Sequence, residues 1–345
     1  MEQRLKFLDV ARGAGILLVV AAHAGLLKHP AASWIYEFYM PLFFVVAGYL
    51  SGRLGTMQTA AACGKRLIHL IRVYFAGSAA LFLIWFFMYP VRERNFSQVG
   101  RVVGSILYGR MTDPSNGFLL DACWTGPMWF LTLMVTSQVL LFWALKLDSG
   151  TSARRILLLT GLLLGAQWLR KTPVLLPWCL DTAPMAAALM LISAWMGQKK
   201  ILEAPADRRV KAGYLVLIVL FICLHDTYDL HQKYYGQWND LRGTLAFFLA
   251  GLCGSLLFLQ ICRMLTQWTP VADPFALVGR NSLAVFIGHT FLIWAVDGVF
   301  LRLPAFPSAG ALRGGIVLLA GVLVPIAGQY AVRFMLRQIS CKTEK

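Results

Sequence analysis

Apolar residues occupy the chain in long runs that are separated by short polar segments. A helix needs about 20 apolar residues to cross the ~30 Å hydrocarbon core of a bilayer. We therefore predict an all-α, polytopic integral membrane protein. Its transmembrane helices, about ten in number by this length criterion, are expected over residues 10–27, 35–54, 68–88, 125–145, 155–170, 174–196, 211–225, 243–262, 275–296 and 314–335.

The composition supports this class. Hydrophobic residues make up 58% of the 345 residues and charged residues only 14%, which is too apolar for an ordinary soluble protein. The first run lacks a small-residue cleavage site, so we interpret it as a retained helix rather than a signal peptide. We expect one transmembrane domain over residues 1–345, with no appended soluble domain.

The formal net charge of +16 raises the possibility of a nucleic-acid partner. The basic residues are scattered through short connections and form no long tail, so they indicate membrane topology instead. Lys and Arg are in excess on the face formed by the two termini and the connections 53–72, 146–155, 198–211 and 263–274. The positive-inside rule then places both termini in the cytoplasm, as expected of a multi-pass protein of the cell membrane. The seven cysteines show no CxxC spacing, and we predict no metal site.

The first helix carries two ionisable groups, Arg12 and His23. They are separated by eleven positions, which is about 20° more than three full turns at ~100° per residue, so both side chains share one face. The rise between them is roughly 16 Å, about half of the hydrocarbon thickness. An arginine at a helix start often extends to lipid phosphates, and a buried histidine often makes a structural hydrogen bond. Ionisable groups within a span are costly, however, and two on one face favour a functional site.

The stretch from Asp9 to Gly13, with Arg12 within it, is followed by His23 after ten residues, and it resembles the first-helix signature of the acyltransferase family 3 membrane proteins. These proteins move acyl groups, most often acetyl from acetyl-CoA, onto hydroxyls of cell-surface carbohydrates. The second span is also similar, although Tyr39 stands where the fucose-acetylase-like branch often has histidine, and Ala47 where the family tends to have a hydroxyl residue.

Three later segments extend the resemblance: the basic residues Arg66 and Arg72 ahead of Tyr74, the element Trp129-Phe130-Leu131, and the run from Gly279 to Leu283 with His289 beyond it. His23 and His289 lie at similar depth, roughly 20 Å into their spans. We therefore expect that these two histidines can meet.

The resemblance implies a membrane O-acyltransferase that moves an acyl group, most often acetyl, from cytoplasmic acyl-CoA to a hydroxyl of a lipid-linked or surface glycan. His23, with an ordinary imidazole pKa near ~6.5, is the predicted general base or transient acyl carrier, and Arg12 assists it. The phosphates of acetyl-CoA need arginine, and the candidates are Arg12, Arg66, Arg72 and Arg280.

The predicted substrate-binding residues are Trp124, Trp129 and His289. Aromatic rings stack on sugars, and the alternative for both tryptophans is an interfacial belt in contact with membrane lipids. The alternative for His289 is a structural hydrogen bond. The loop over residues 225–242 could suggest a metal site, because it carries Asp226, Asp229, His231 and Asp240. The histidine and the carboxylates have no fixed helical spacing, so we interpret it as a solvated loop that faces carbohydrate.

The main competing hypothesis is a transporter or flippase for a surface-polysaccharide precursor, since intramembrane Arg and His also fit a proton-coupled path. The sequence has no internal repeat of the kind that many transporters carry. A sensory or scaffolding protein would leave Arg12 and His23 without a role.

Overall fold

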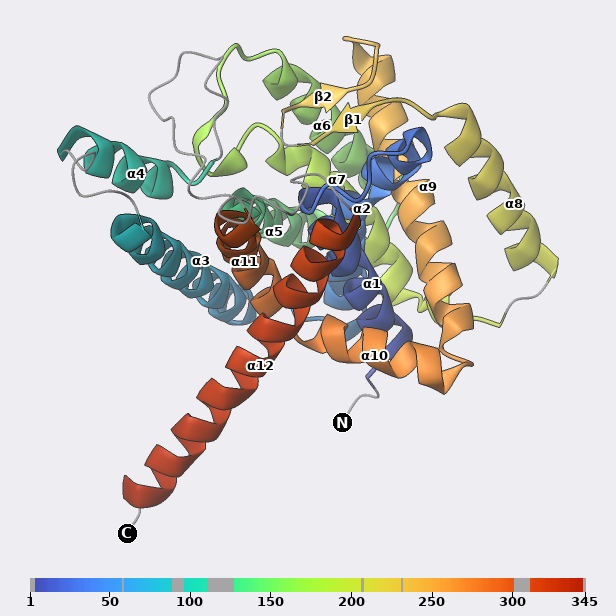
Figure 1. Ribbon diagram of the computed structural model, residues 1–345. Coiled ribbons are helices and arrows are strands. Elements are labelled where there is room, and N and C mark those ends of the chain that lie inside the picture. Colours follow the sequence, from blue (N-terminus) through green and yellow to red (C-terminus); the bar gives the residue numbers. More distant parts are fainter. Residues whose placement is uncertain are drawn as a thin grey trace. The chain divides into compact units, whose positions relative to one another are not determined.

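The computed structural model describes residues 4–57, 59–88, 96–110, 127–205, 208–230, 232–300 and 311–343. Within them the chain forms twelve α-helices and one small antiparallel hairpin, in which β1 (Tyr228–Asp229) pairs with β2 (Tyr234–Tyr235) (Figure 1). The all-α class predicted from the sequence is confirmed.

Six of the described helical segments are long and apolar enough to cross a membrane, namely Pro30–Leu54, Ala60–Ile84, Trp129–Leu147, Pro177–Gln198, Leu241–Leu265 and Leu312–Met335. Helices α10 (Thr269–Arg280) and α11 (Ser282–Phe300) are bent by 78° at their junction, and they add a seventh span if the pair counts as one. Helix α1 (Lys6–His23) carries Lys6, Asp9 and Arg12 in its first half and His23 at its end, and it is otherwise apolar. The total of about ten spans stays a prediction from the length criterion.

The chain packs into two compact units. Unit 1 comprises Met1–Ala32 and Phe258–Lys345, and unit 2 comprises Ser33–Leu257. Helix α9 (Leu241–Leu265) contributes its last turns to unit 1. A single functional domain with both termini in the cytoplasm stays a prediction.

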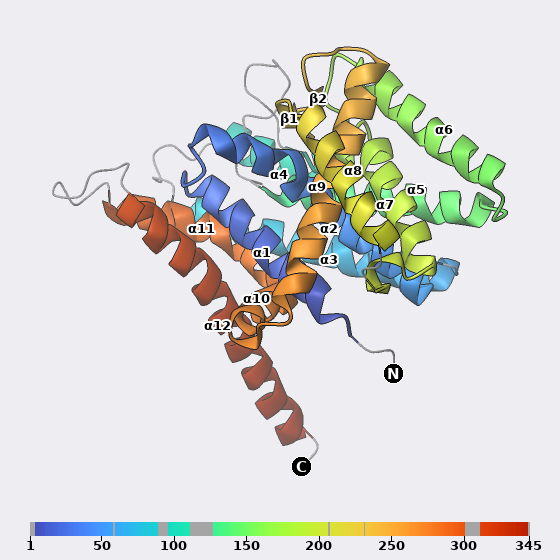
Figure 2. The ribbon, with the colours of Figure 1, turned by 90° about the vertical axis from the view of Figure 1, so that its right-hand side faces the viewer.

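In unit 1, α1 lies against α10, because each helix has a glycine where the two backbones approach most closely (Figure 2). A Cβ atom at Gly13 would lie 1.9 Å from the carbonyl oxygen of Phe275, and one at Gly279 would lie 1.8 Å from that of Asp9. No other residue fits at either position without separating the helices. Two of the segments that resemble the family therefore pack directly on each other.

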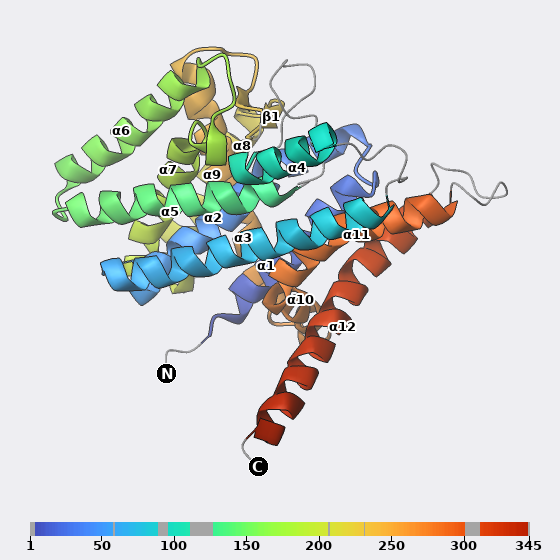
Figure 3. The same ribbon diagram turned by 90° about the vertical axis from the view of Figure 1, so that its left-hand side faces the viewer.

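The remaining pair of helices in unit 1 is α11 and α12 (Ala311–Thr343), which lie side by side (Figure 3). Gly288 of α11 faces Pro325 of α12, and Gly321 of α12 approaches Val20 and His289. Small residues thus bring α12 close to the histidine that α11 carries.

Unit 2 is built around α7 (Ala183–Gln198), most of whose residues are buried. Helix α2 (Ser33–Leu54) packs on it through Gly48 and Gly52. A Cβ atom at Gly48 would lie 2.2 Å from the Met190 carbonyl oxygen, and one at Gly52 would lie 1.9 Å from that of Ala194. Arg53, near the end of α2, is fixed by Glu203, with 2.6 Å between Nε and Oε1, and Tyr49 donates to the same carboxylate at 3.0 Å. The small-residue face of α2 and its basic end therefore fix this helix on α7.

The other elements of unit 2 are α3 (Ala60–Met88), α4 (Phe96–Tyr108), α5 (Trp129–Leu147), α6 (Ser152–Arg170) and α8 (Arg208–Cys223). Helices α5 and α6 both pack on α7 and are joined by a short connection (Figure 3). Helix α3 packs on α5 in turn.

Candidate active site

Two histidines of unit 1 form a direct hydrogen bond. His23 is the last residue of α1, and His289 lies in the middle of α11. His23 Nδ1 and His289 Nε2 are 2.8 Å apart, and the two rings are nearly parallel with centroids 5.1 Å apart. The expectation that these side chains can meet is confirmed.

The contacts of His289 decide which ring nitrogens carry protons. Its Nδ1 lies 2.8 Å from the Phe286 carbonyl oxygen and 3.1 Å from that of Val285, and carbonyls only accept hydrogen bonds. His289 Nδ1 therefore carries the hydrogen, and its Nε2 is the acceptor for the N–H at His23 Nδ1. The remaining nitrogen of His23, Nε2, is left with its lone pair in the neutral ring.

The two rings differ in accessibility, because His289 is fully buried whereas His23 is exposed. An exposed imidazole with a bare nitrogen can take a proton from a hydroxyl or attack a carbonyl carbon. The buried partner fixes the tautomer and the ring orientation, as a carboxylate does in a serine hydrolase. Both nitrogens of His289 already have protein partners.

Arg12 lies on α1 beside a buried carboxylate that is bound mainly by another residue. Arg4 donates to Asp9 through two of its guanidinium nitrogens, Nε to Oδ2 at 2.6 Å and Nη2 to Oδ1 at 3.1 Å. Arg12 Nη1 is 4.0 Å from Asp9 Oδ1, which is too long for a hydrogen bond, and its side chain is 31% exposed. The Arg12 guanidinium is thus held near Asp9 and is accessible to an anionic ligand.

Arg280 is exposed at the end of α10, where the chain bends into α11. The next residue, Asn281, is buried and donates through its amide to the Leu277 carbonyl oxygen at 2.8 Å. The Asn281 carbonyl in turn accepts from the backbone N–H of Ala284 and Val285, which starts α11. This asparagine builds the bend that carries His289.

The other residues predicted for the site lie in unit 2 or outside the described residues. Arg66 Nη1 contacts the hydroxyls of Ser51 and Thr56, both at 3.4 Å, and Arg72 is exposed on α3. Trp129 begins α5, with its ring edge-on to Phe130. Trp124 lies outside the described residues.

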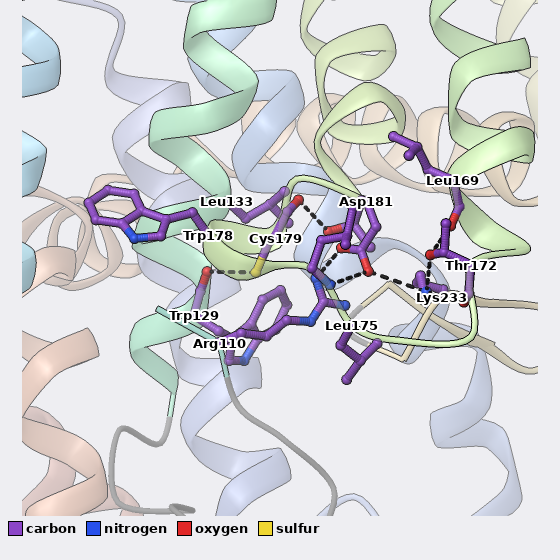
Figure 4. Close-up of polar contacts among 12 residues, drawn as sticks. Arg110, Trp129, Leu133, Leu169, Thr172, Leu175, Trp178, Cys179, Asp181 and Lys233 are labelled. Carbon is purple, nitrogen blue, oxygen red and sulfur yellow. Dashed lines mark hydrogen bonds and ion pairs between the residues drawn. The ribbon is translucent and has the colours of Figure 1, made fainter. Parts of the chain in front are cut away.

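Unit 2 also contains a buried ionic cluster that the sequence analysis did not find (Figure 4). Arg110 and Lys233 both contact the carboxylate of Asp181, the lysine at 3.3 Å. Lys233 also donates to the carbonyl oxygens of Thr172 and Val174, at 3.0 and 3.1 Å, and burial lowers its pKa. The cluster ties the segment before α7 to the β-hairpin, so it serves as a structural connection.

A strained turn lies beside this cluster. Trp178 and Cys179 have φ angles of 53° and 55°, in the left-handed region that bulky residues avoid. The turn is held because Trp178 Nε1 donates to the Leu107 carbonyl oxygen at 2.9 Å and Thr136 donates to the Trp178 carbonyl oxygen at 3.1 Å. The Cys179 thiol contacts the Trp129 carbonyl oxygen at 3.6 Å (Figure 4), so the strain is stored next to a residue predicted to bind substrate.

The fold and the histidine pair together define a membrane protein with an accessible, oriented imidazole suited to proton or group transfer. Residues 5–329 match the family profile described as "Acyltransferase domain", and the chain belongs to this family, acyltransferase family 3. Comparisons with curated proteins and with solved structures gave no match. The chain is therefore a membrane acyltransferase; its place in the fucose-acetylase-like branch stays a prediction.

Proposed function

We propose that this protein is an O-acyltransferase that moves an acyl group, acetyl in the first instance, from cytoplasmic acyl-CoA to a hydroxyl of a cell-surface or exported glycan. The observation that carries the proposal is the hydrogen bond between His23 Nδ1 and His289 Nε2. It leaves His23 Nε2 as a bare nitrogen on an exposed ring.

In the base route, His23 Nε2 accepts the proton of the glycan hydroxyl as the hydroxyl oxygen attacks the thioester carbonyl carbon. The carbon–sulfur bond breaks, and the departing thiolate of CoA takes that proton from His23, so the ring ends as it began. In the nucleophilic route, Nε2 itself attacks the carbonyl carbon, and the glycan then receives the acyl group from the imidazole. Both routes use the same nitrogen.

His289 acts in either route as a positioning residue. Its buried Nε2 accepts the N–H of His23 and stabilises the positive charge that develops on the His23 ring when Nε2 is protonated or acylated. This role differs from the substrate contact that the sequence suggested, because both ring nitrogens of His289 are already bonded within unit 1.

The donor would be held through its phosphates by arginine. Arg12 is suited to this role because its guanidinium is accessible and only loosely paired with Asp9. It lies roughly 16 Å along α1 from His23 by helical rise, a gap that the flexible arm of CoA is needed to cover. Arg66 and Arg72 are further candidates because they lie in a basic segment, and Arg280 is a candidate because it is exposed at the end of α10.

The acceptor would be a glycan in contact with the aromatic residues Trp129 and Trp124. The test is to incubate the purified protein with acetyl-CoA and to measure free CoA thiol in the presence and absence of a panel of glycans. Thiol release that depends on one glycan, with the acetyl group found on that glycan by mass spectrometry, is the expected result. Transport of an unmodified glycan without thiol release would favour the flippase hypothesis instead.

A further inference from the structure

Three polar side chains that take no part in the proposed acyl transfer at His23 lie in a row at the N-terminus of α2. Ser33 is the first residue of α2, and Glu37 follows one turn later. His225, between α8 and β1, lies between them. The Ser33 hydroxyl oxygen is 3.4 Å from His225 Nε2, and His225 Nδ1 is paired with the Glu37 carboxylate. All three residues belong to unit 2.

The carboxylate sets the tautomer of His225. A carboxylate accepts hydrogen bonds, and Glu37 Oε1 also accepts from the backbone N–H of Asp226 at 3.3 Å. His225 Nδ1 therefore carries the hydrogen, and its Nε2 presents a lone pair toward the Ser33 hydroxyl. The indole ring of Trp34 stacks on the imidazole, with centroids 3.8 Å apart and planes within 6°, which fixes the plane of the ring.

The three side chains differ in their exposure to solvent. Glu37 is fully buried, the His225 side chain is 33% exposed, and Ser33 is partly exposed. An ion pair that only ties the loop to α2 would not need a hydroxyl at the second ring nitrogen. A buried orienting acid, a base above it and an accessible hydroxyl are the arrangement that activates a serine nucleophile.

We propose that Ser33, His225 and Glu37 form a second acyl-transfer site, which takes acyl groups from carboxylic esters. The Ser33 oxygen bonds to the ester carbonyl carbon while its proton passes to His225 Nε2. The bond from that carbon to the leaving oxygen breaks, and His225 returns the proton to the departing alcohol. The acyl group remains on Ser33 until water or another hydroxyl removes it by the same steps in reverse. The site goes beyond the proposed function and shares no residue with it.

The test uses the full-length purified protein and a fluorophosphonate, a probe that reacts preferentially with activated serines. We expect the probe to be found on the peptide that contains Ser33, by tandem mass spectrometry. His225→Gln should slow this labelling by on the order of 100-fold or more, the usual contribution of a general base. Glu37→Gln should also slow it, because a neutral amide does not stabilise the positive charge on His225 when its Nε2 takes the serine proton.

Ser152 provides the matched control, since it is also the first residue of a helix, α6, and is exposed to solvent. Ser152→Ala should leave the labelling unchanged and Ser33→Ala should abolish it, with the thermal unfolding temperature of each variant measured alongside. His23→Ala should be labelled at Ser33 as fast as the wild type. This result would show that the Ser33 site works independently of the His23 site of the proposed function. An unlabelled Ser33 in folded protein, or equal labelling rates for the wild type and His225→Gln, would overturn the proposal.

Discussion

Replacement of His289 tests whether this residue positions His23 or binds the substrate. His289→Ala removes the acceptor of the His23 Nδ1 hydrogen, which is 2.8 Å away in the wild type. A hydrogen bond to a charged group contributes about 1.5–3 kcal/mol, and the His23 ring becomes charged in the transition state. If the transition state bears this whole loss, kcat falls by about 13- to 160-fold, at 1.36 kcal/mol per tenfold change in rate. The KM for the glycan should change little, because the proposed positioning role involves no contact between His289 and the glycan.

The assay is acceptor-dependent release of CoA thiol over a range of glycan concentrations, for the single variants and for the double variant. His289→Gln offers a carbonyl oxygen in place of Nε2 and should recover part of kcat, whereas His289→Phe fills the space without an acceptor and should not. The double variant with His23→Ala should be no slower than His23→Ala alone, since the two side chains act as a unit. A His289 variant with a raised KM for the glycan and an unchanged kcat would refute the positioning role and would support a contact between His289 and the glycan instead.

Three further predictions concern donor binding, packing and pH. Arg12→Ala should weaken acetyl-CoA binding in calorimetry and Arg12→Lys should restore it only in part, since an ammonium does not replace the guanidinium fork; unchanged affinity would leave Arg12 as a lipid contact. Gly279→Ala should lower the unfolding temperature by the equivalent of about 1–3 kcal/mol, because its Cβ would overlap the α1 backbone, whereas Gly315→Ala in α12, with open space around it, should not. The hydrogen bond from Arg53 lowers the pKa of Glu203 in the folded protein. The stability that Glu203 contributes is therefore fully present above the pKa it has in the unfolded chain, and it is lost as pH falls through the pKa it has in the folded protein. The difference in unfolding temperature between the wild type and Glu203→Gln should narrow in acid, and a difference that widens there would contradict this account.

Much of the fold followed from the length of the apolar runs, and the histidine pair from counting positions. His23 and His289 stand at similar depths in their spans, and depth along a helix can be read from the sequence. The count of spans is harder to derive, because α1 mixes charged residues into an apolar helix and α10 and α11 are bent at Asn281. That bend depends on a side-chain cap to the Leu277 carbonyl, a contact that apolar periodicity does not encode.

The polar clusters of unit 2 could not be predicted for a different reason. Arg110 and Asp181 are 71 positions apart, and Glu37 and His225 are 188 apart, so only the packing of α2 and α7 with the loops brings the partners together. The left-handed turn at Trp178 and Cys179 contains no glycine or asparagine, the residues from which such a turn is normally predicted. Single-sequence reasoning finds partners on one helix face far more readily than partners on distant segments.

The central claim is that the bare nitrogen of His23 performs the acyl transfer, and the most direct measurement is the rate of acetyl transfer by purified His23→Ala. The measurement needs the acceptor found in the glycan screen, saturating acetyl-CoA, and a check that the variant unfolds at the temperature of the wild type. The account predicts a fall in kcat of on the order of 100-fold or more. A folded His23→Ala protein with near-normal transfer would contradict it.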